Sequence, residues 1–286
     1  MTRLSTIFLL ILIRFCASAQ TPVLLKDLNV KTEYSPSPNL IFAVGNTVFF
    51  AKDDGSKGTE LWKSDGTALG TGLVKDIREG SYGSNPKNFA RLNSTLFFCA
   101  DNGTNGNELW KTDGTISGTV LVKDIWEGAG SSNPSKLTVA NGILFFAADN
   151  GISGMELWRS DGTEAGTVLV KDIRANNSSF PSSLTNVNNI LFFTADDNNG
   201  DTELWRTDGT TNGTTLVRNI NPNGSSYPFE LTVAGNVLYF SADDGNSGRE
   251  LWRTNGTDGS TVRVTDIWPG TSSGNPRQFM SVLRIG

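Results

Sequence analysis

Acidic turns, Asp-Asp or Asp-Asn, recur along this chain at intervals of 47 or 48 residues and are the first candidates for chemistry. Carboxylate oxygens are the ligands that Ca²⁺ prefers, and paired carboxylates can also cleave glycosidic bonds. The weak calcium candidates are Asp53, Asp54, Asp101, Asp149, Asp196, Asp197, Asp243 and Asp244. Adjacent acidic residues lack the alternation of a calcium-binding loop, so side-chain hydrogen bonds that close a turn are the favoured interpretation.

Other residues offer little support for catalysis. The chain has no histidine, which excludes a Ser-His-Asp triad, a Cys-His pair and a histidine-ligated metal. An Asp-Asp or Asp-Asn turn recurs in every copy of the repeat, which favours a structural role over a single catalytic centre. We therefore predict no catalytic residues and no cofactor, with calcium as a possible companion, and a carbohydrate-active enzyme is the alternative.

Five aromatic residues outside the repeated pattern are the predicted ligand-binding residues. They are Tyr82, Trp126, Phe180, Tyr227 and Trp268. All follow the last strand of a copy, in loops that vary between copies, and such loops usually carry binding. Aromatic rings beside Asp and Asn suit a glycan, and they suit a protein partner equally well. The alternative is that the rings cover blade edges, which fits Trp126 and Trp268 better than Tyr82 and Tyr227.

The elements that must position these residues form five tandem copies of one unit. A Glu-Leu-Trp sequence anchors each copy, with spacings of 48, 48, 47 and 47 residues. This period is typical of a β-propeller or another repeat array. A residue found in every copy is most simply explained by packing. The predicted structural core is therefore Trp62, Trp110, Trp158, Trp205 and Trp252.

Each copy contains four predicted strands, a to d. In the third copy they cover residues 136–140, 143–148, 155–160 and 167–173, with the hairpin signal Asn141-Gly142 between a and b. Strand b carries adjacent aromatics, Phe145-Phe146, whose side chains point to opposite faces, so both faces must be buried. The predicted fold class is all-β, a propeller-like array of five four-stranded antiparallel blades, with an open β-solenoid as the alternative.

The repeat predicts a single domain over residues 20–286, after a signal peptide over 1–19. Partial units at 23–28 and 276–283 predict one extra strand at each end. The chain then forms either a five-bladed ring with surplus edge strands or part of a longer array. The complete units lie at about 36–77, 84–125, 132–173, 179–220 and 226–267.

Two further features of the unit carry structural predictions. An Asp-Gly-Thr turn follows Glu-Leu-Trp in four copies, and Asn255 replaces the Asp in the fifth. The Glu of strand c is predicted to pair across strands with the Lys of strand d, as Glu60 with Lys75. Because meandering strands alternate in direction, the b–c turns and the d–a loops should emerge on one face.

The repeated string Glu-Leu-Trp-x-Ser/Thr-Asp-Gly-Thr resembles the bacterial ELWxxDGT-repeat family, over about residues 23–282. The resemblance implies a secreted or surface-exposed repeat protein with propeller-like architecture. It implies no established activity.

The first residues predict export. Arg3 precedes an apolar run over 4–13, and Ala17-Ser18-Ala19 fits a signal-peptidase site. Cys16 raises a bacterial lipoprotein as an alternative. We predict a secreted or cell-surface protein with no transmembrane segment after cleavage.

Net charge and cysteine content limit the classes of partner that the protein can be expected to bind. Cleavage removes two of 24 basic residues and leaves 22 against 29 acidic ones, a net charge of −7. Such a chain lacks the cluster of basic residues that binds nucleic acid or anionic lipid. Only Cys99 would remain, in a strand, where it is predicted to be buried. The predicted partner is a glycan or a protein at the cell surface, and a purely structural module of a larger adhesive protein is the alternative.

Overall fold

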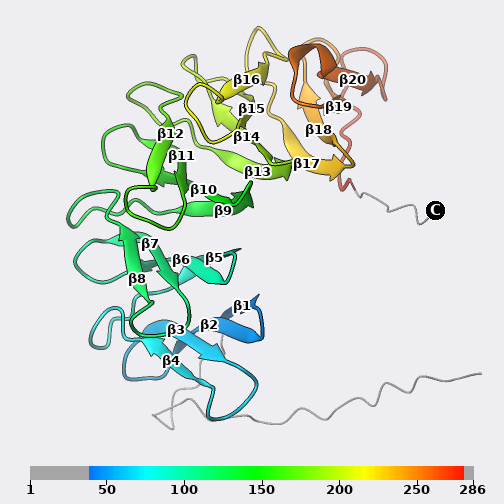
Figure 1. Ribbon diagram of the computed structural model, residues 1–286. Helices are drawn as coiled ribbons and strands as arrows, with labels where there is room; N and C mark the ends of the chain where they lie inside the picture. The colour runs from blue at the N-terminus through cyan, green and yellow to red at the C-terminus, as the bar shows by residue number, and fades with distance from the viewer. Residues whose placement is uncertain (1–38, 280–286) are drawn as a thin grey trace, which may run out of the picture.

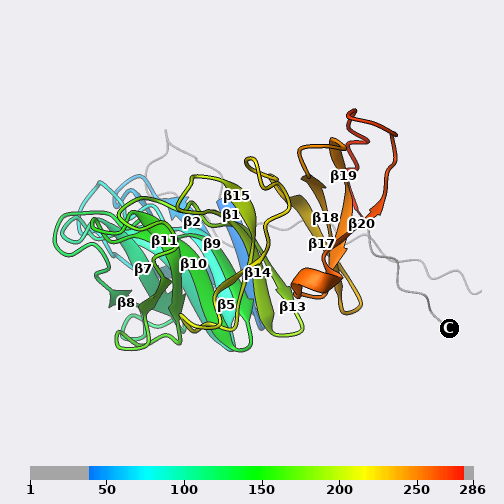
Figure 2. The ribbon, with the colours of Figure 1, turned by 90° about the horizontal axis from the view of Figure 1, so that it is seen from above.

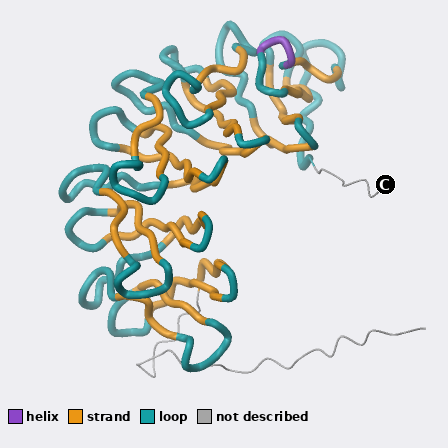
Figure 3. The backbone as a smooth tube through the Cα atoms, viewed as in Figure 1, coloured by secondary structure: helices purple, strands orange, loops and turns teal. Residues whose placement is uncertain are grey.

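The computed structural model describes residues 39–279, so the predicted signal peptide and the partial unit at 23–28 lie outside it. These residues form five four-stranded antiparallel sheets, here called blades one to five in chain order. Figure 3 shows that strands dominate, with one turn of 3₁₀ helix, η1 (Asp258–Ser260), in the described part. The predicted all-β array of five blades is confirmed.

Every blade is a meander of strands a to d in chain order. The a strands are β1 (Asn39–Val44), β5 (Lys87–Leu92), β9 (Ser135–Ala140), β13 (Ser182–Val187) and β17 (Phe229–Ala234). The b strands are β2 (Thr47–Asp53), β6 (Thr95–Asp101), β10 (Ile143–Asp149), β14 (Ile190–Asp196) and β18 (Val237–Asp243). The c strands are β3 (Thr59–Ser64), β7 (Asn107–Thr112), β11 (Met155–Ser160), β15 (Thr202–Thr207) and β19 (Arg249–Thr254). The d strands are β4 (Gly72–Lys75), β8 (Val120–Lys123), β12 (Val168–Lys171), β16 (Thr215–Arg218) and β20 (Val262–Thr265).

The blades stand side by side along an open arc (Figure 1). The a strands line its concave side, where β1, β5, β9, β13 and β17 contact one another in turn. Blades one and five lie at opposite ends, so residues 39–279 do not close a five-bladed ring. Seen from above, η1 and the segment after β20 mark opposite edges of blade five, which are the two faces of the arc (Figure 2).

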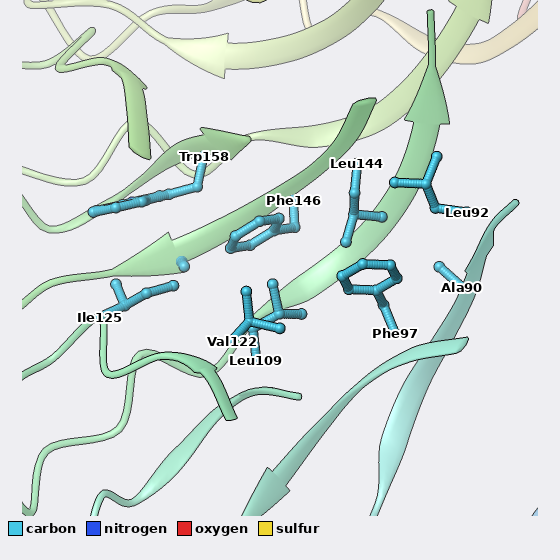
Figure 4. Close-up of a cluster of buried hydrophobic side chains, with 10 residues drawn as sticks. Ala90, Leu92, Phe97, Leu109, Val122, Ile125, Leu144, Phe146 and Trp158 are labelled. Carbon is cyan, nitrogen blue, oxygen red and sulfur yellow. The ribbon is translucent and has the colours of Figure 1, made fainter. Parts of the chain in front are cut away.

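The apolar cores lie between consecutive blades, at interfaces that we call seams. At the seam of blades two and three, Phe97 and Leu109 meet Phe146 and Trp158 (Figure 4). The other three seams repeat this arrangement, in which the first aromatic of strand b faces the next blade and the second faces the preceding one. All five Glu-Leu-Trp tryptophans are buried, at 6–9% exposure, as predicted.

The Asp-Gly-Thr turns are closed by side-chain hydrogen bonds, also as predicted. Asp161 Oδ1 accepts the Thr163 amide at 2.8 Å and the Thr163 hydroxyl at 2.7 Å. Gly162 has φ +93°, and a Cβ there would lie 3.1 Å from Phe97 Cζ of the preceding blade. Glycine is therefore required both by the backbone and by the seam.

The outer face of blade five has no following blade among the described residues. Val264 and Ile267 are 44% and 47% exposed there, whereas the equivalent Val217 and Ile220 are 4% and 5% exposed at the seam of blades four and five. Residues 276–279 form no strand, so the extra C-terminal strand predicted at 276–283 is not seen in the described part of that range.

Candidate ligand-binding face

The b–c turns and the d–a loops do share one face, which we call the loop face. The Asn85 amide, in the loop after blade one, donates to Thr59 O at the start of strand c at 3.0 Å. The Asp101 amide, at the end of strand b in blade two, donates to Ser84 O of the same loop at 3.0 Å. Equivalent bonds recur at the later seams. Each d–a loop is thus tied to the blades on both sides of its seam.

A buried glutamate holds each of these loops from beneath. Glu156 Oε2 accepts the Ile173 amide at 3.2 Å and the Ser179 hydroxyl at 2.6 Å, and Glu156 Oε1 accepts the Ser179 amide at 3.0 Å. The Glu of every Glu-Leu-Trp is at most 1% exposed and binds its own loop in the same way. The repeated Glu is therefore an anchor for the loop face.

The predicted pairing of Glu60 with Lys75 is wrong. In the register of β3 and β4, Lys75 lies opposite Leu61. Lys75 therefore shares the strand face of Leu61, while Glu60 points to the other face. Lys75 Nζ instead donates across the seam to Thr119 O of blade two at 2.9 Å. The cations of the next three blades make the same cross-seam bond, so strand d fastens each blade to its successor.

Burial of these glutamates makes stability depend on pH. Burial raises the pKa of Glu156 from 4.5 to about 7, opposed in part by the hydrogen bonds from the loop, and the pKa values of Glu60, Glu108 and Glu203 are raised for the same reason. The folded state then binds more protons than the unfolded chain between those two pKa values. Stability is highest below the unfolded pKa and is lost as pH rises through the folded one.

We accordingly expect the free energy of unfolding to fall from about pH 5 to about pH 8. Urea denaturation across this range measures it. Glu156→Gln, which mimics the protonated acid, should flatten part of the slope. A free energy of unfolding that rises over the same range would contradict the expectation.

The acidic b–c turns use their carboxylates internally. Asp149 Oδ1 accepts the Gly151 amide at 2.7 Å, and Asp54 Oδ1 accepts the amides of Ser56 and Lys57 at 2.8 and 3.0 Å. Among residues 39–279, no group of three or more Cys, Asp or Glu side chains gathers at metal-binding distance. The eight calcium candidates thus have turn-closing roles available, and within residues 39–279 they do not gather into such a group.

The five candidate aromatics lie in five separate d–a loops rather than in one pocket, and all are exposed. Tyr82 stacks on its own loop, with the Arg78 guanidinium 5.3 Å from its ring centre. Trp126 and Trp268 occupy equivalent positions after strand d. Trp126 lies so close to Gly151 of the next blade that a Cβ there would meet its ring at 2.5 Å, and it is 37% exposed against 63% for Trp268. Trp126 covers a blade edge, and Trp268 has no following blade in the described chain to cover.

Phe180 and Tyr227 differ from the others in their backbone. Both precede a proline and have left-handed φ values, +49° and +44°. Asn85, Asn133 and Asn275 occupy the same position at the other loops, with φ of 46–51°. Asparagine tolerates this conformation, whereas a bulky residue there is strained. Neither packing nor backbone geometry explains the two aromatics, and strain of this kind is typical of functional sites.

Tyr227 lines a pocket on the loop face at the seam of blades four and five, with a volume of about 390 Å³. Pro228 and Phe229 form its wall next to Tyr227, and the guanidinium carbons of Arg249 and Arg277 lie 4.8 and 5.7 Å from the Phe229 ring centre. The remaining lining residues are Ser182, Ser183, Thr194 and Thr202. The pocket combines aromatic rings, hydroxyl groups and two cations, and suits a polar ligand with an apolar face.

Phe229, Arg249 and Arg277 were not among the predicted site residues. A signal was present for Phe229 and Arg249, because each departs from its repeat position, whereas Arg277 has a basic counterpart in Lys87. Arg249 stands where the other copies have Thr59, Asn107, Met155 and Thr202. The three residues are scattered over about fifty residues of sequence, and only the fold brings them together.

Cys99 offers no chemistry. It is fully buried, its thiol donates to Pro134 O at 2.8 Å, and burial raises its pKa to about 12. A thiol in this environment is not a nucleophile at neutral pH. The prediction that Cys99 is a buried strand residue is confirmed.

No family model matches this sequence, and no curated protein sequence matches it. Solved structures do match. A prolyl endopeptidase aligns at a TM-score of 0.50 with 10% identity, over 82% of this chain and 36% of its own. Puromycin hydrolase aligns at 0.48 with 14% identity, over 82% and 38%. The β-propeller domain of the Trilobed protease from Pyrococcus furiosus aligns at 0.45 with 10% identity, over 79% and 70%.

These likenesses bear on the fold alone. One of these neighbours is itself described as a β-propeller domain. This chain spans less than half the length of the endopeptidase and puromycin hydrolase chains that it matches. In the described part of the chain, no helix is long and apolar enough to span a membrane.

Proposed function

We propose that this protein is an exported, non-enzymatic propeller-like scaffold that binds a glycan through its loop face, as a member of the ELWxxDGT-repeat group. The observation that carries the proposal is the pair Phe180 and Tyr227, exposed aromatics held at backbone positions that asparagine fills elsewhere. Exposed aromatic rings stack well on the apolar face of a sugar. The recurring glutamates support a binding role over catalysis, because their carboxylates are engaged in holding loops.

Replacing the two aromatics by the residue of the sister loops tests this directly. We expect Tyr227→Asn and Phe180→Asn each to raise the free energy of unfolding by about 1 kcal/mol through relief of backbone strain. The same variants should weaken glycan binding by about tenfold or more. A glycan array followed by titration of the hits, alongside urea denaturation, measures both effects.

Asn133→Ala is the matched control, since it changes the equivalent loop position without removing a ring. It should leave glycan binding unchanged. The proposal fails if the mature chain binds no glycan, or if both aromatic variants bind every hit as tightly as the parent. Binding of a protein partner, abolished by the same two variants, would keep the face and replace the ligand class.

A second candidate function is a structural module within a larger surface assembly. The exposed Val264 and Ile267 favour it, because their equivalents are buried by a following blade at the other seams. A module of this kind needs no small ligand. It would give no hit on the array and would associate with a neighbouring repeat domain through the outer face of blade five.

A further inference from the structure

The pocket at the seam of blades four and five gathers the residues in which this chain departs most from its own repeat. Tyr227 replaces an asparagine, Phe229 stands where other copies have Lys87, Ser135 or Ser182, and Arg249 has no basic counterpart. Residues shared by all copies build the seams. Residues that differ from their counterparts in other copies and lie together in one pocket therefore need an explanation other than the fold.

The two arginines of this pocket form no ion pair within 4.0 Å among the described residues, although Asp243 lies opposite Arg249 on the adjacent strand. Among the described residues, Arg78, Arg174, Arg218 and Arg263 each lie within ion-pair distance of an aspartate. Neither Arg249 nor Arg277 does, although the chain carries a net negative charge. Arg91, Arg159, Arg206 and Arg253 also lack an ion pair among the described residues, so the distinguishing feature of Arg249 and Arg277 is that the two like charges share one aromatic ring.

The surroundings hold Arg249 in place and leave its charge undercompensated. Its Nη1 donates to Tyr227 O at 2.8 Å and to Ser241 O at 3.4 Å. Burial lowers the pKa of Arg249, and the neighbouring Arg277 lowers it further, against an opposing effect of Asp243 on the adjacent strand. An anion bound in the pocket would offset both the burial of the Arg249 charge and its repulsion by Arg277.

The remaining walls fit a sugar better than a peptide. Ser182, Ser183, Thr194 and Thr202 line the pocket beside the exposed Tyr227 ring, and the hydroxyl groups of Ser182 and Thr194 hydrogen-bond to each other at 2.8 Å. Ser183 also lines a hollow of about 500 Å³ along the concave a strands, with Asn88, Lys136 and Thr138. The two hollows share Ser183, and the second also has the apolar lining residues Phe89, Leu137 and Leu184, so a chain of linked sugars has a surface of mixed polarity beyond the first residue.

We propose that this pocket binds the carboxylate of an acidic polysaccharide, with Arg249 and Arg277 on the carboxylate and Tyr227 against the sugar ring. The inference rests on the proposed glycan-binding function and names its ligand class. Guanidinium groups bind carboxylates through strong, charge-assisted hydrogen bonds. The sugar of this class is a uronic acid.

Calorimetric titration of the mature chain with oligomers of pectate, alginate and hyaluronan tests the ligand class. Methyl-esterified pectate oligomers are the matched control, because they keep the sugar backbone and cap the charge. We expect at least one uronate oligomer to bind. If pectate binds, its esterified form should bind about tenfold more weakly or not at all. The affinity for the uronate should also fall as the salt concentration is raised. Poly-glutamate serves as the acidic peptide probe.

Variants test the residues. Arg277→Gln should weaken uronate binding by about tenfold. The double variant Arg249→Gln/Arg277→Gln should weaken it by more than about tenfold. Arg253→Gln removes the same charge from an exposed position further along β19 and should change nothing. Arg277 makes no hydrogen bond to another described residue. Its single variant therefore keeps the test valid if loss of Arg249 destabilises the pocket.

The outcomes separate this inference from the proposed function. Neutral glycans that bind in a Tyr227-dependent way, with no uronate binding, would overturn the acidic ligand and leave the scaffold proposal standing. Uronate binding that survives both arginine changes would overturn the pocket. Tighter binding of poly-glutamate than of every uronate would replace the polysaccharide by an acidic protein. Binding of nothing in either experiment would sink both proposals.

Discussion

Trp158→Ala is expected to lower the free energy of unfolding by about 3–5 kcal/mol, as for other buried large-to-small changes. Trp158 is 6% exposed and packs with Phe146 against Val122 and Ile125 of the preceding blade. Removal of the indole therefore opens a cavity at the seam of blades two and three and weakens the contact between them. Urea denaturation followed by circular dichroism measures the loss.

Two further tryptophan variants make this result specific. Trp268→Ala removes the same side chain from a position that is 63% exposed, and should cost less than about 1 kcal/mol. Trp158→Phe keeps an aromatic ring and removes an indole N–H that has no hydrogen-bond acceptor among the described residues. It should cost clearly less than Trp158→Ala. Equal unfolding midpoints for Trp158→Ala and Trp268→Ala would refute the seam as the source of stability.

Glu156→Ala is the second change with a large expected effect. It leaves the Ile173 amide and the Ser179 hydroxyl without their acceptor, at a cost of about 1–3 kcal/mol for each buried donor, while the Ser179 amide keeps its bond to Met155 O. The loop from blade three to blade four would then lose its anchor. We expect lower global stability together with faster hydrogen exchange at residues 173–180, measured by mass spectrometry.

The control for this change is Glu164→Ala, which removes an equal charge from an exposed turn of the same blade. Its exchange pattern and stability should match those of the parent protein within about 0.5 kcal/mol. If Glu156→Ala left the exchange of residues 173–180 unaltered, the carboxylate would not be holding the loop.

Much of the fold could be predicted from short stretches of sequence because the signals are local. In blade three, the predicted strands at 136–140, 143–148 and 155–160 match β9, β10 and β11 to within one residue at each end. Turn residues mark where strands stop, and Phe145-Phe146 shows that both strand faces are dry. Burial of the five Glu-Leu-Trp tryptophans between blades was predicted by the same reasoning, because each blade must cover the apolar face of its neighbour.

The role of the repeated glutamate could not be predicted in this way. Glu60 and Lys75 are near each other in a strand diagram, and opposite charges suggest a pair. The register places Lys75 opposite Leu61, which sends the two charges to different faces. Register depends on the bulge between Leu61 and Trp62, and no local sequence signal marks it.

The candidate site was predicted only in part. The loop face followed from strand direction, and exposure of Tyr82 and Tyr227 agrees with the prediction. The left-handed backbone at Tyr227 was not foreseeable, because a residue before proline usually adopts an extended conformation. Arg249 and Arg277 escaped notice because only the stacking of blades four and five brings them over one ring.

The shared cores have an evolutionary consequence. Because each core draws half of its side chains from one unit and half from the next, gain or loss of a whole unit recreates the same contact wherever it occurs. At each junction, a buried glutamate also anchors the surface loop that leads to the next blade. Mutation can therefore change the surface loop at a single junction while the loops at the other junctions keep their anchors.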